Sequence, residues 1–228
     1  MHVVFESPPA LPALETFCRG LASEYPETQR INSMSMALNA SAAASTLNTS
    51  TSVLGFRLGN VAGDRVVQVR RNGISFSHLA PYSEWGTFAA EAGPLFSRYV
   101  SEFSVKEVSR LAVRFINRIP VKEGCDIDDY VNVGPRLPST CPDVEGYFMQ
   151  LVLPQADMGS EWKAIINTGL ENVGSDGSMV ILLDIDVFCQ KRMYFTEDSV
   201  WGVFNQLRER KNSIFEDAIT DQVRSMIE

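Results

Sequence analysis

The chain has 228 residues, 45% of them hydrophobic and 21% charged, which is the composition of an ordinary globular protein with a packed core. Its formal net charge of −8 disfavours nucleic acid and anionic membranes as ligands, because both require a basic surface. The same acidity is compatible with a basic protein partner. No apolar run approaches the roughly 20 residues of a membrane helix, and the N-terminal segment lacks the basic start of a signal peptide. We therefore expect no membrane association and a cytoplasmic location.

Cysteine and histidine are sparse, and they are widely spaced: Cys18, Cys125, Cys141, Cys189, His2 and His78. A zinc site usually requires closely spaced ligands, and reduced thiols are typical of cytosolic proteins, so we expect no metal and no other cofactor. No GxSxG, Walker loop, GxGxxG or HExxH motif is present. Ser83 and Glu84 lie where a turn leads into a helix, which favours capping, and a structural role for His78, over general-base catalysis.

The first half of the chain is predicted to form several strands and then a long helix. In order, the elements are a strand at His2–Phe5, a helix at Leu11–Tyr25, strands at Ser52–Leu58, Arg65–Arg71 and Gly73–Leu79, and a helix from Pro81 that is kinked at Gly93-Pro94. Asn72-Gly73 is a strong hairpin signal between two of these strands. Residues 32–52 are rich in Ser, Ala, Asn and Thr. We interpret them as a variable connection with some strand, the alternative being a mobile flap.

The second half repeats this order of strands followed by a helix. Its predicted elements are a long strand at Val105–Pro120, an irregular segment at Glu123–Asp143, strands at Gly146–Leu153, Trp162–Leu170 and Ser178–Phe188, and one long helix at Asp198–Ile227. The last helix carries an apolar stripe for the core. Its basic residues are interpreted as a solvated side: Arg208, Arg210, Lys211 and Arg224.

Because helices do not alternate singly with strands, a doubly wound parallel sheet is disfavoured. The predicted fold class is α+β, with antiparallel curved sheets in two similar halves, each backed by a long helix. We expect a single domain over residues 1–228, with halves at 1–104 and 105–228.

Two strands carry charges at alternate positions, which places those charges on one face. The first strand offers Arg110, Arg114 and Arg118, and the second offers Asp184 and Asp186. The predicted ligand-binding residues are therefore Arg110, Arg114, Arg118, Asp184, Asp186, Lys163 and Asn167, and Gln150 joins them in some registers. One interpretation is a cross-strand ladder of ion pairs. The other is a polar groove that receives an anionic small molecule or a charged segment of a protein partner. No third acidic residue at a telling spacing supports a metal at the Asp-x-Asp pair.

Four segments occur in the order FSHLAPYSEW, RLAVRFINRIP, LLDIDVF and IFEDAITD. Together they resemble a sporadically distributed, uncharacterised family of prokaryotic proteins, over roughly Val53 to the end of the chain. The region before Ser52 departs from that resemblance. The resemblance implies no activity, since no catalytic residues are assigned in the family. The patchy distribution implies an accessory role, such as defence-linked regulation.

These observations favour a non-enzymatic binding or regulatory protein that uses a polar sheet face. The alternative is an enzyme or binder that handles phosphate or nucleotides, of the type built as an antiparallel triphosphate tunnel. The ExExK signature of those tunnels is missing, because the N-terminal strand offers only Glu6. A carrier with an apolar cavity between sheet and helix is a third hypothesis.

Overall fold

The computed structural model describes residues 1–5, 9–40, 45–80, 84–122, 124, 126–138, 140–141, 144–172 and 178–227. Several residues named above lie outside this set: Glu6, Pro81, Ser83, Glu123, Cys125 and Asp143. The chain divides into two compact units. Unit 1 is Met1–Arg110 with Arg192–Glu197, and unit 2 is Leu111–Lys191 with Asp198–Glu228. Among the described residues, no helix has both the length and the apolar character needed to span a bilayer.

Unit 1 is a sheet with helices against one face. Its elements are β1 (His2–Phe5), α1 (Leu11–Arg19), β2 (Glu27–Ala40), β3 (Ser45–Gly59), β4 (Arg65–Arg70), β5 (Gly73–His78), α2 (Trp85–Glu102), the start of β6 (Glu107–Val121) and β10 (Met193–Tyr194). The strand order is β2-β3-β4-β5-β1-β6, with β10 paired to β6. Gly73 lets β1 and β5 approach, because a Cβ there would lie 2.2 Å from the Val3 carbonyl oxygen.

Aromatic side chains hold α1 and α2 against the sheet of unit 1. The Tyr99 ring of α2 stacks on Phe5 at a centroid distance of 4.9 Å and meets Phe17 of α1 edge-on at 5.6 Å. Nearer the start of α2, Phe88 stacks on Phe76 of β5 at 5.2 Å. The buried Tyr99 hydroxyl donates a hydrogen bond to the Arg70 carbonyl at 3.0 Å, so its polar atom is satisfied.

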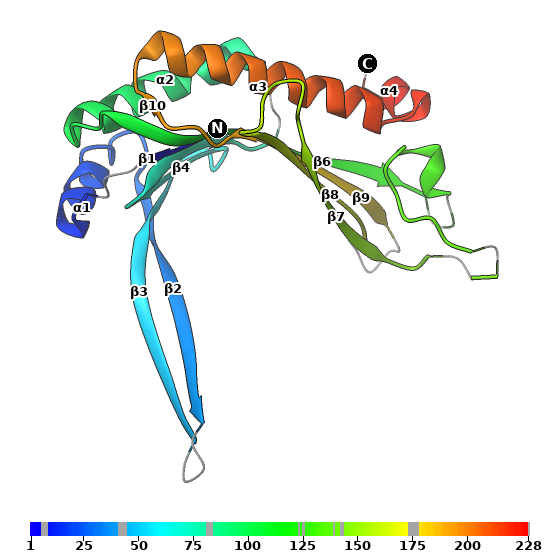
Figure 1. Ribbon diagram of the computed structural model, residues 1–228, viewed down its shortest axis with the longest axis horizontal. Helices are drawn as coiled ribbons and strands as arrows, with labels where there is room; N and C mark the ends of the chain where they lie inside the picture. The colour runs from blue at the N-terminus through cyan, green and yellow to red at the C-terminus, as the bar shows by residue number, and fades with distance from the viewer. Residues whose placement is uncertain are drawn as a thin grey trace. The chain divides into compact units, whose positions relative to one another are not determined.

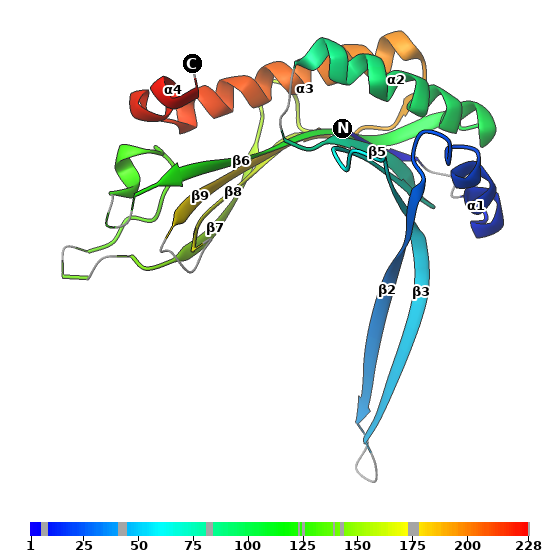
Figure 2. The ribbon, with the colours of Figure 1, turned by 180° about the vertical axis from the view of Figure 1, so that it is seen from behind.

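The interpretation of residues 32–52 as a variable connection with some strand underestimates the strand, because residues 32–40 and 45–52 all lie in β2 and β3. Strands β2 and β3 pair continuously from Glu27 opposite Gly59 to Ala40 opposite Ser45, with one irregularity between Ile31 and Asn32. Figures 1 and 2 show this hairpin reaching well beyond β4. The segment was mistaken for a loop because Ser, Asn and Ala are weak strand formers, whereas here the backbone ladder forms regardless of them.

Unit 2 is a four-stranded antiparallel sheet backed by a long helix. Its elements are the rest of β6, a 3-10 turn (Ile127–Asp129), β7 (Tyr147–Pro154), β8 (Trp162–Asn172), β9 (Met179–Cys189), α3 (Glu197–Ala218) and α4 (Asp221–Ile227). The strand order is β6-β9-β8-β7. One face packs against α3, because Phe115 of β6 contacts the ammonium of Lys211 on that helix. The fully buried residues of β9 lie on the same face: Ile181, Leu183, Ile185 and Val187.

The predicted α+β class is confirmed, with antiparallel pairing and a long helix behind the sheet of each unit. The alternation expected in the strand at Ser178–Phe188 is also present. Buried aliphatic residues face α3, and the two aspartates point the other way. We call this second side of the unit 2 sheet the open face.

This alternation gives a stability test with two leucines that are adjacent in β9. Leu183 is fully buried against the α3 side, whereas Leu182 lies half-buried on the open face. We expect Leu183→Ala to lower the free energy of unfolding by about 3 kcal/mol through the cavity it leaves, and Leu182→Ala by about 1 kcal/mol. Urea denaturation of both variants measures the difference, and equal losses would contradict the register.

Candidate functional site

The open face of unit 2 presents three neighbouring rows of side chains that run across β6, β9, β8 and β7. The central row places Ile116, Asp184, Asn167 and Gln150 opposite one another. The rows beside it are Arg118, Leu182, Gly169 and Phe148 on one side, and Arg114, Asp186, Ile165 and Val152 on the other. A chain of polar groups therefore lies between two rows that are rich in apolar side chains.

The polar groups of the central row are connected by hydrogen bonds. Arg114 donates from Nε and one Nη to the two carboxylate oxygens of Asp184, at 2.7 and 2.6 Å. The Asn167 amide donates to Asp184 at 2.8 Å, and the Gln150 amide donates to Asn167 at 2.7 Å. This arrangement joins all four strands through side chains.

Burial within this network is uneven. The side chain of Asp184 is only 3% exposed, whereas that of Arg114 is 55% exposed. The hydrogen bond from Arg114 to Asp184 is the main cause that raises the pKa of the arginine. Because a bidentate pair fixes the guanidinium plane, Arg114 is held in one orientation. The negative charge of Asp186, opposite Arg114 in the ladder, acts on the same guanidinium.

The other predicted site residues lie in several different environments. Arg118 pairs with Glu171 at 3.1 Å, a contact in which both side chains are about half exposed. Asp186 lies opposite Arg114 in the β-ladder, and Lys163 is exposed at the end of β8. Arg110 belongs to unit 1, where its Nη1 lies 3.1 Å from Nδ1 of His2.

Burial and the contact with Arg110 together determine the protonation state of the His2 ring. Burial lowers the pKa of His2 to about 4, and the positive charge of Arg110 contributes further. The ring is therefore neutral at pH 7. Since arginine has only donors, Nδ1 of His2 accepts the hydrogen bond.

The charges on the open face of unit 2 cancel. Arg114, Arg118 and Lys163 contribute three positive charges, and Asp184, Asp186 and Glu171 contribute three negative ones. A face of this kind lacks the excess of positive charge that attracts a phosphate group. It suits a ligand with both polar and apolar groups.

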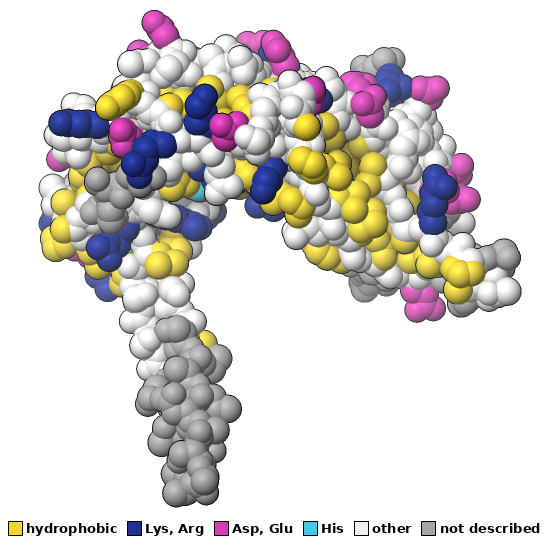
Figure 3. Space-filling model, in the orientation of Figure 1, with side chains coloured by type: hydrophobic (Ala, Val, Ile, Leu, Met, Phe, Trp, Pro, Cys, Tyr) yellow, Lys and Arg dark blue, Asp and Glu magenta, His cyan; other side chains and the backbone are white. Residues whose placement is uncertain are grey.

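Large apolar side chains on the open face were missed by the sequence analysis. Ile116 is 58% exposed, Phe148 is 68% exposed and Val152 is 57% exposed. Figure 3 shows hydrophobic side chains gathered over the strands of unit 2. The signal was present in the alternation of YFMQLVLP, in which Phe148, Gln150 and Val152 share one face of an edge strand.

The interpretation of Lys211 as a solvated residue was wrong. Its side chain is buried, and its ammonium lies 3.7 Å from the centroid of Phe115 and 6.0 Å from that of Phe215. Burial lowers the pKa of Lys211 to about 8, and the charge of Arg208 lowers it further. The helical pattern of charges did not reveal this, because a lysine can replace an apolar residue where aromatic rings accept its cation.

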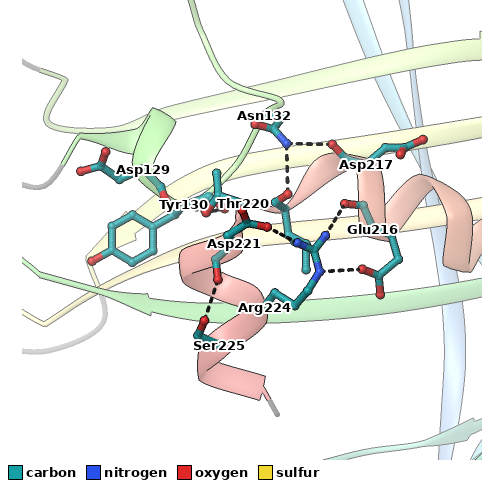
Figure 4. Close-up of polar contacts among 10 residues, drawn as sticks. Asp129, Tyr130, Asn132, Glu216, Asp217, Thr220, Asp221, Arg224 and Ser225 are labelled. Carbon is teal, nitrogen blue, oxygen red and sulfur yellow. Dashed lines mark hydrogen bonds and ion pairs between the residues drawn. The ribbon is translucent and has the colours of Figure 1, made fainter.

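The expectation of one helix to Ile227 was also wrong, since α3 ends at Ala218 and α4 begins at Asp221. Figure 4 shows the contacts at this joint. The Asn132 amide donates to the carbonyl oxygens of Asp217 and Ile219, at 2.9 and 3.0 Å. The Thr220 hydroxyl donates to the Asp129 carbonyl at 2.6 Å. The two bonds from Asn132 satisfy carbonyl groups that the broken helix leaves without partners, and the bond from Thr220 ties the joint to the 3-10 turn.

A shallow pocket of about 430 Å³ lies over this joint. Two of its carboxylates are paired with its arginine, because Arg224 contacts both Glu216 and Asp221 (Figure 4). We assign the joint a structural role. The segment IFEDAITD, on which part of the family resemblance depends, is thus the sequence that forms this helix break.

The two arginines of β6 provide a matched test of the network. Arg114→Gln leaves a buried carboxylate without its cationic partner, and we expect the free energy of unfolding to fall by about 2 kcal/mol. This loss is smaller than for a fully buried ion pair, because the Arg114 side chain is partly exposed to water. Arg118→Gln removes a solvated ion pair and should cost no more than about 0.5 kcal/mol. Chemical denaturation measures both, and equal effects would contradict a special role for Asp184.

Lys211 predicts a pH dependence of stability. Its folded pKa of about 8 lies below the ordinary value of 10.5, so between these pH values the unfolded chain binds more protons than the folded one. Stability therefore rises with pH across this window through Lys211. Lys211→Met should flatten that part of the profile, as measured by urea denaturation at several pH values. Parallel profiles for the two proteins would disprove the assignment.

Comparisons of the chain with models of protein families, with curated proteins and with solved structures gave no match.

Within the described ranges, no group of three or more His, Cys, Asp or Glu side chains is arranged to hold a metal ion. Burial raises the pKa of the Cys18 thiol to about 12 and that of Cys189 to about 11, so neither is a ready nucleophile.

Proposed function

We propose that this chain is a non-enzymatic binding protein that contacts a partner protein through the open face of unit 2. The observation that carries the proposal is the exposure of Ile116, Phe148 and Val152 around an arginine that a buried aspartate holds in place. Protein interfaces are enriched in aromatic residues and arginine, and their central contacts are apolar. The neutral balance of charge on this face favours a protein surface over a phosphate-bearing ligand.

Each part of the open face has a separate role in this proposal. The apolar side chains supply surface that a partner removes from water. Arg114 supplies a donor whose direction is set in advance by Asp184, which lowers the entropy lost when a partner binds. Phe148 lies beside Gly169, where a Cβ would come within 2.9 Å of the Tyr147 carbonyl oxygen. Gly169 therefore permits the close packing that supports this ring.

The biological setting belongs to the same proposal. The family resemblance supports a regulatory role in an accessory, defence-linked system of prokaryotes. A cytoplasmic location is supported by the free thiols of Cys18, Cys141 and Cys189 among the described residues.

The proposal predicts that charges on the open face abolish complex formation without unfolding the chain. The test variant is Phe148→Glu with Val152→Glu, and the control is Val61→Glu in the turn after β3 of unit 1, where the side chain is also exposed. Each protein is used as bait in a lysate of the native host, and a partner recovered in stoichiometric amount is then titrated against all three by calorimetry. We expect wild type and Val61→Glu to bind alike and the double variant to lose about a hundredfold or more in affinity.

Two results would count against this function. The first is the absence of any stoichiometric partner, or equal binding by the double variant. The second is release of phosphate from nucleoside triphosphates in the presence of Mg²⁺, which would favour the phosphate-handling alternative. Unchanged melting temperatures of the variants exclude unfolding as the cause of lost binding.

A further inference from the structure

The far part of the β2–β3 hairpin is a two-stranded ribbon with two open edges. Strand β4 pairs with β3 only over Gly55–Gly59. The residues beyond, 32–40 of β2 and 45–53 of β3, pair with each other and with no other strand among those described. We call these two segments the ribbon; Figures 1 and 2 show it extending away from β4 and α1.

The ribbon and its flanks carry no charge. No Asp, Glu, Lys, Arg or His occurs in the 26 residues from Ile31 to Phe56, and the bounding residues are Arg30 and Arg57. At the chain average of 21% charged residues, about five charges would be expected in a segment of this length. No proline interrupts it either. Natural proteins normally protect exposed edge strands with charges or proline, and this ribbon has neither protection.

A ribbon of this kind is incomplete by itself. An isolated two-stranded hairpin is marginally stable in water, whereas three or more strands form a stable sheet. The outer edge of β2 presents a row of backbone donors and acceptors along its length, because β2 is the first strand in the order of the sheet. These groups are suited to pairing with a further strand.

We infer that the outer edge of β2 pairs with the same edge of a second copy of this chain, so that two ribbons form one antiparallel four-stranded sheet. In a twofold symmetric antiparallel pair, a residue at the axis meets its own copy, and a residue on one side meets the residue equally far on the other side. A charge at or next to the axis therefore lies close to a like charge. An edge without any charge meets this requirement. A partner of opposite charge would instead be recognised through charged residues, which the ribbon lacks.

The inference is tested by placing the same charges on either strand of the ribbon. Met34 lies opposite Thr51 and Met36 lies opposite Thr49, so the two pairs occupy equivalent positions on adjacent strands. Met34→Lys with Met36→Lys charges the strand that pairs with the second copy. Thr49→Lys with Thr51→Lys is the matched control, with the same charge on the strand that does not.

Sedimentation equilibrium of the full chain gives the readout. We expect wild type to have twice the 25.3 kDa mass of one chain, the β2 variant to dimerise about a hundredfold more weakly, and the β3 variant to remain dimeric. Mixing the β2 lysine variant with Met34→Glu/Met36→Glu should restore dimers, because opposite charges then meet across the edge.

Any of the following results would overturn the inference: a wild-type monomer at high micromolar concentration, equal weakening by the β2 and β3 variants, or failure of the lysine and glutamate variants to form a mixed dimer. A shortened chain, in which Asn-Gly replaces residues 34–51, keeps the pairing of Glu27–Ser33 with Ser52–Gly59. It should be monomeric, and a dimer formed by this chain would equally contradict pairing through the ribbon.

Discussion

The buried carboxylate of Asp184 is the constraint around which unit 2 is organised. Helix α3 covers one face of its sheet, so alternate residues of every strand lie either in the core or on the open face. Asp184 lies on the open face and is still buried, because Arg114 and Asn167 cover it with hydrogen bonds. A charge removed from water requires such partners. The network fixes the relative positions of β6, β9, β8 and β7 and holds one arginine side chain in a single orientation.

Much of unit 2 could be predicted from alternation alone. The pattern of LLDIDVF separated Leu183 and Ile185 from Asp184 and Asp186, and the ladder between β9 and β6 follows that separation. What alternation did not provide was the pairing of particular side chains. The prediction grouped Arg110, Arg114 and Arg118 because they share one strand face, yet each has a different neighbour: His2, Asp184 and Glu171. Cross-strand register depends on long-range contacts that a single strand does not encode.

Two of the incorrect predictions have a common physical origin. At Lys211 and at the break after Ala218, local residue preference favoured one outcome and a specific distant contact produced another. Asn132 ends α3 with two hydrogen bonds from a segment far away in the sequence, while the sequence of the helix itself contains neither glycine nor proline near the break. Phe115 similarly provides the environment that allows Lys211 to be buried. The periodicity of hydrophobic residues describes one segment alone, so it does not predict contacts with residues that are distant in the sequence.

The distribution of charge separates two kinds of surface in this chain. On the open face of unit 2, equal numbers of positive and negative groups lie among exposed apolar side chains, which allows a partner with both kinds of group to dock in one orientation. On the ribbon, charge is absent altogether, and recognition there depends on backbone hydrogen bonds that are independent of side-chain identity. The first surface selects its ligand by side-chain geometry centred on Arg114. The ribbon can pair with strands of many sequences. Its selectivity comes from symmetry, because an uncharged edge can pair with its own copy without placing like charges opposite each other.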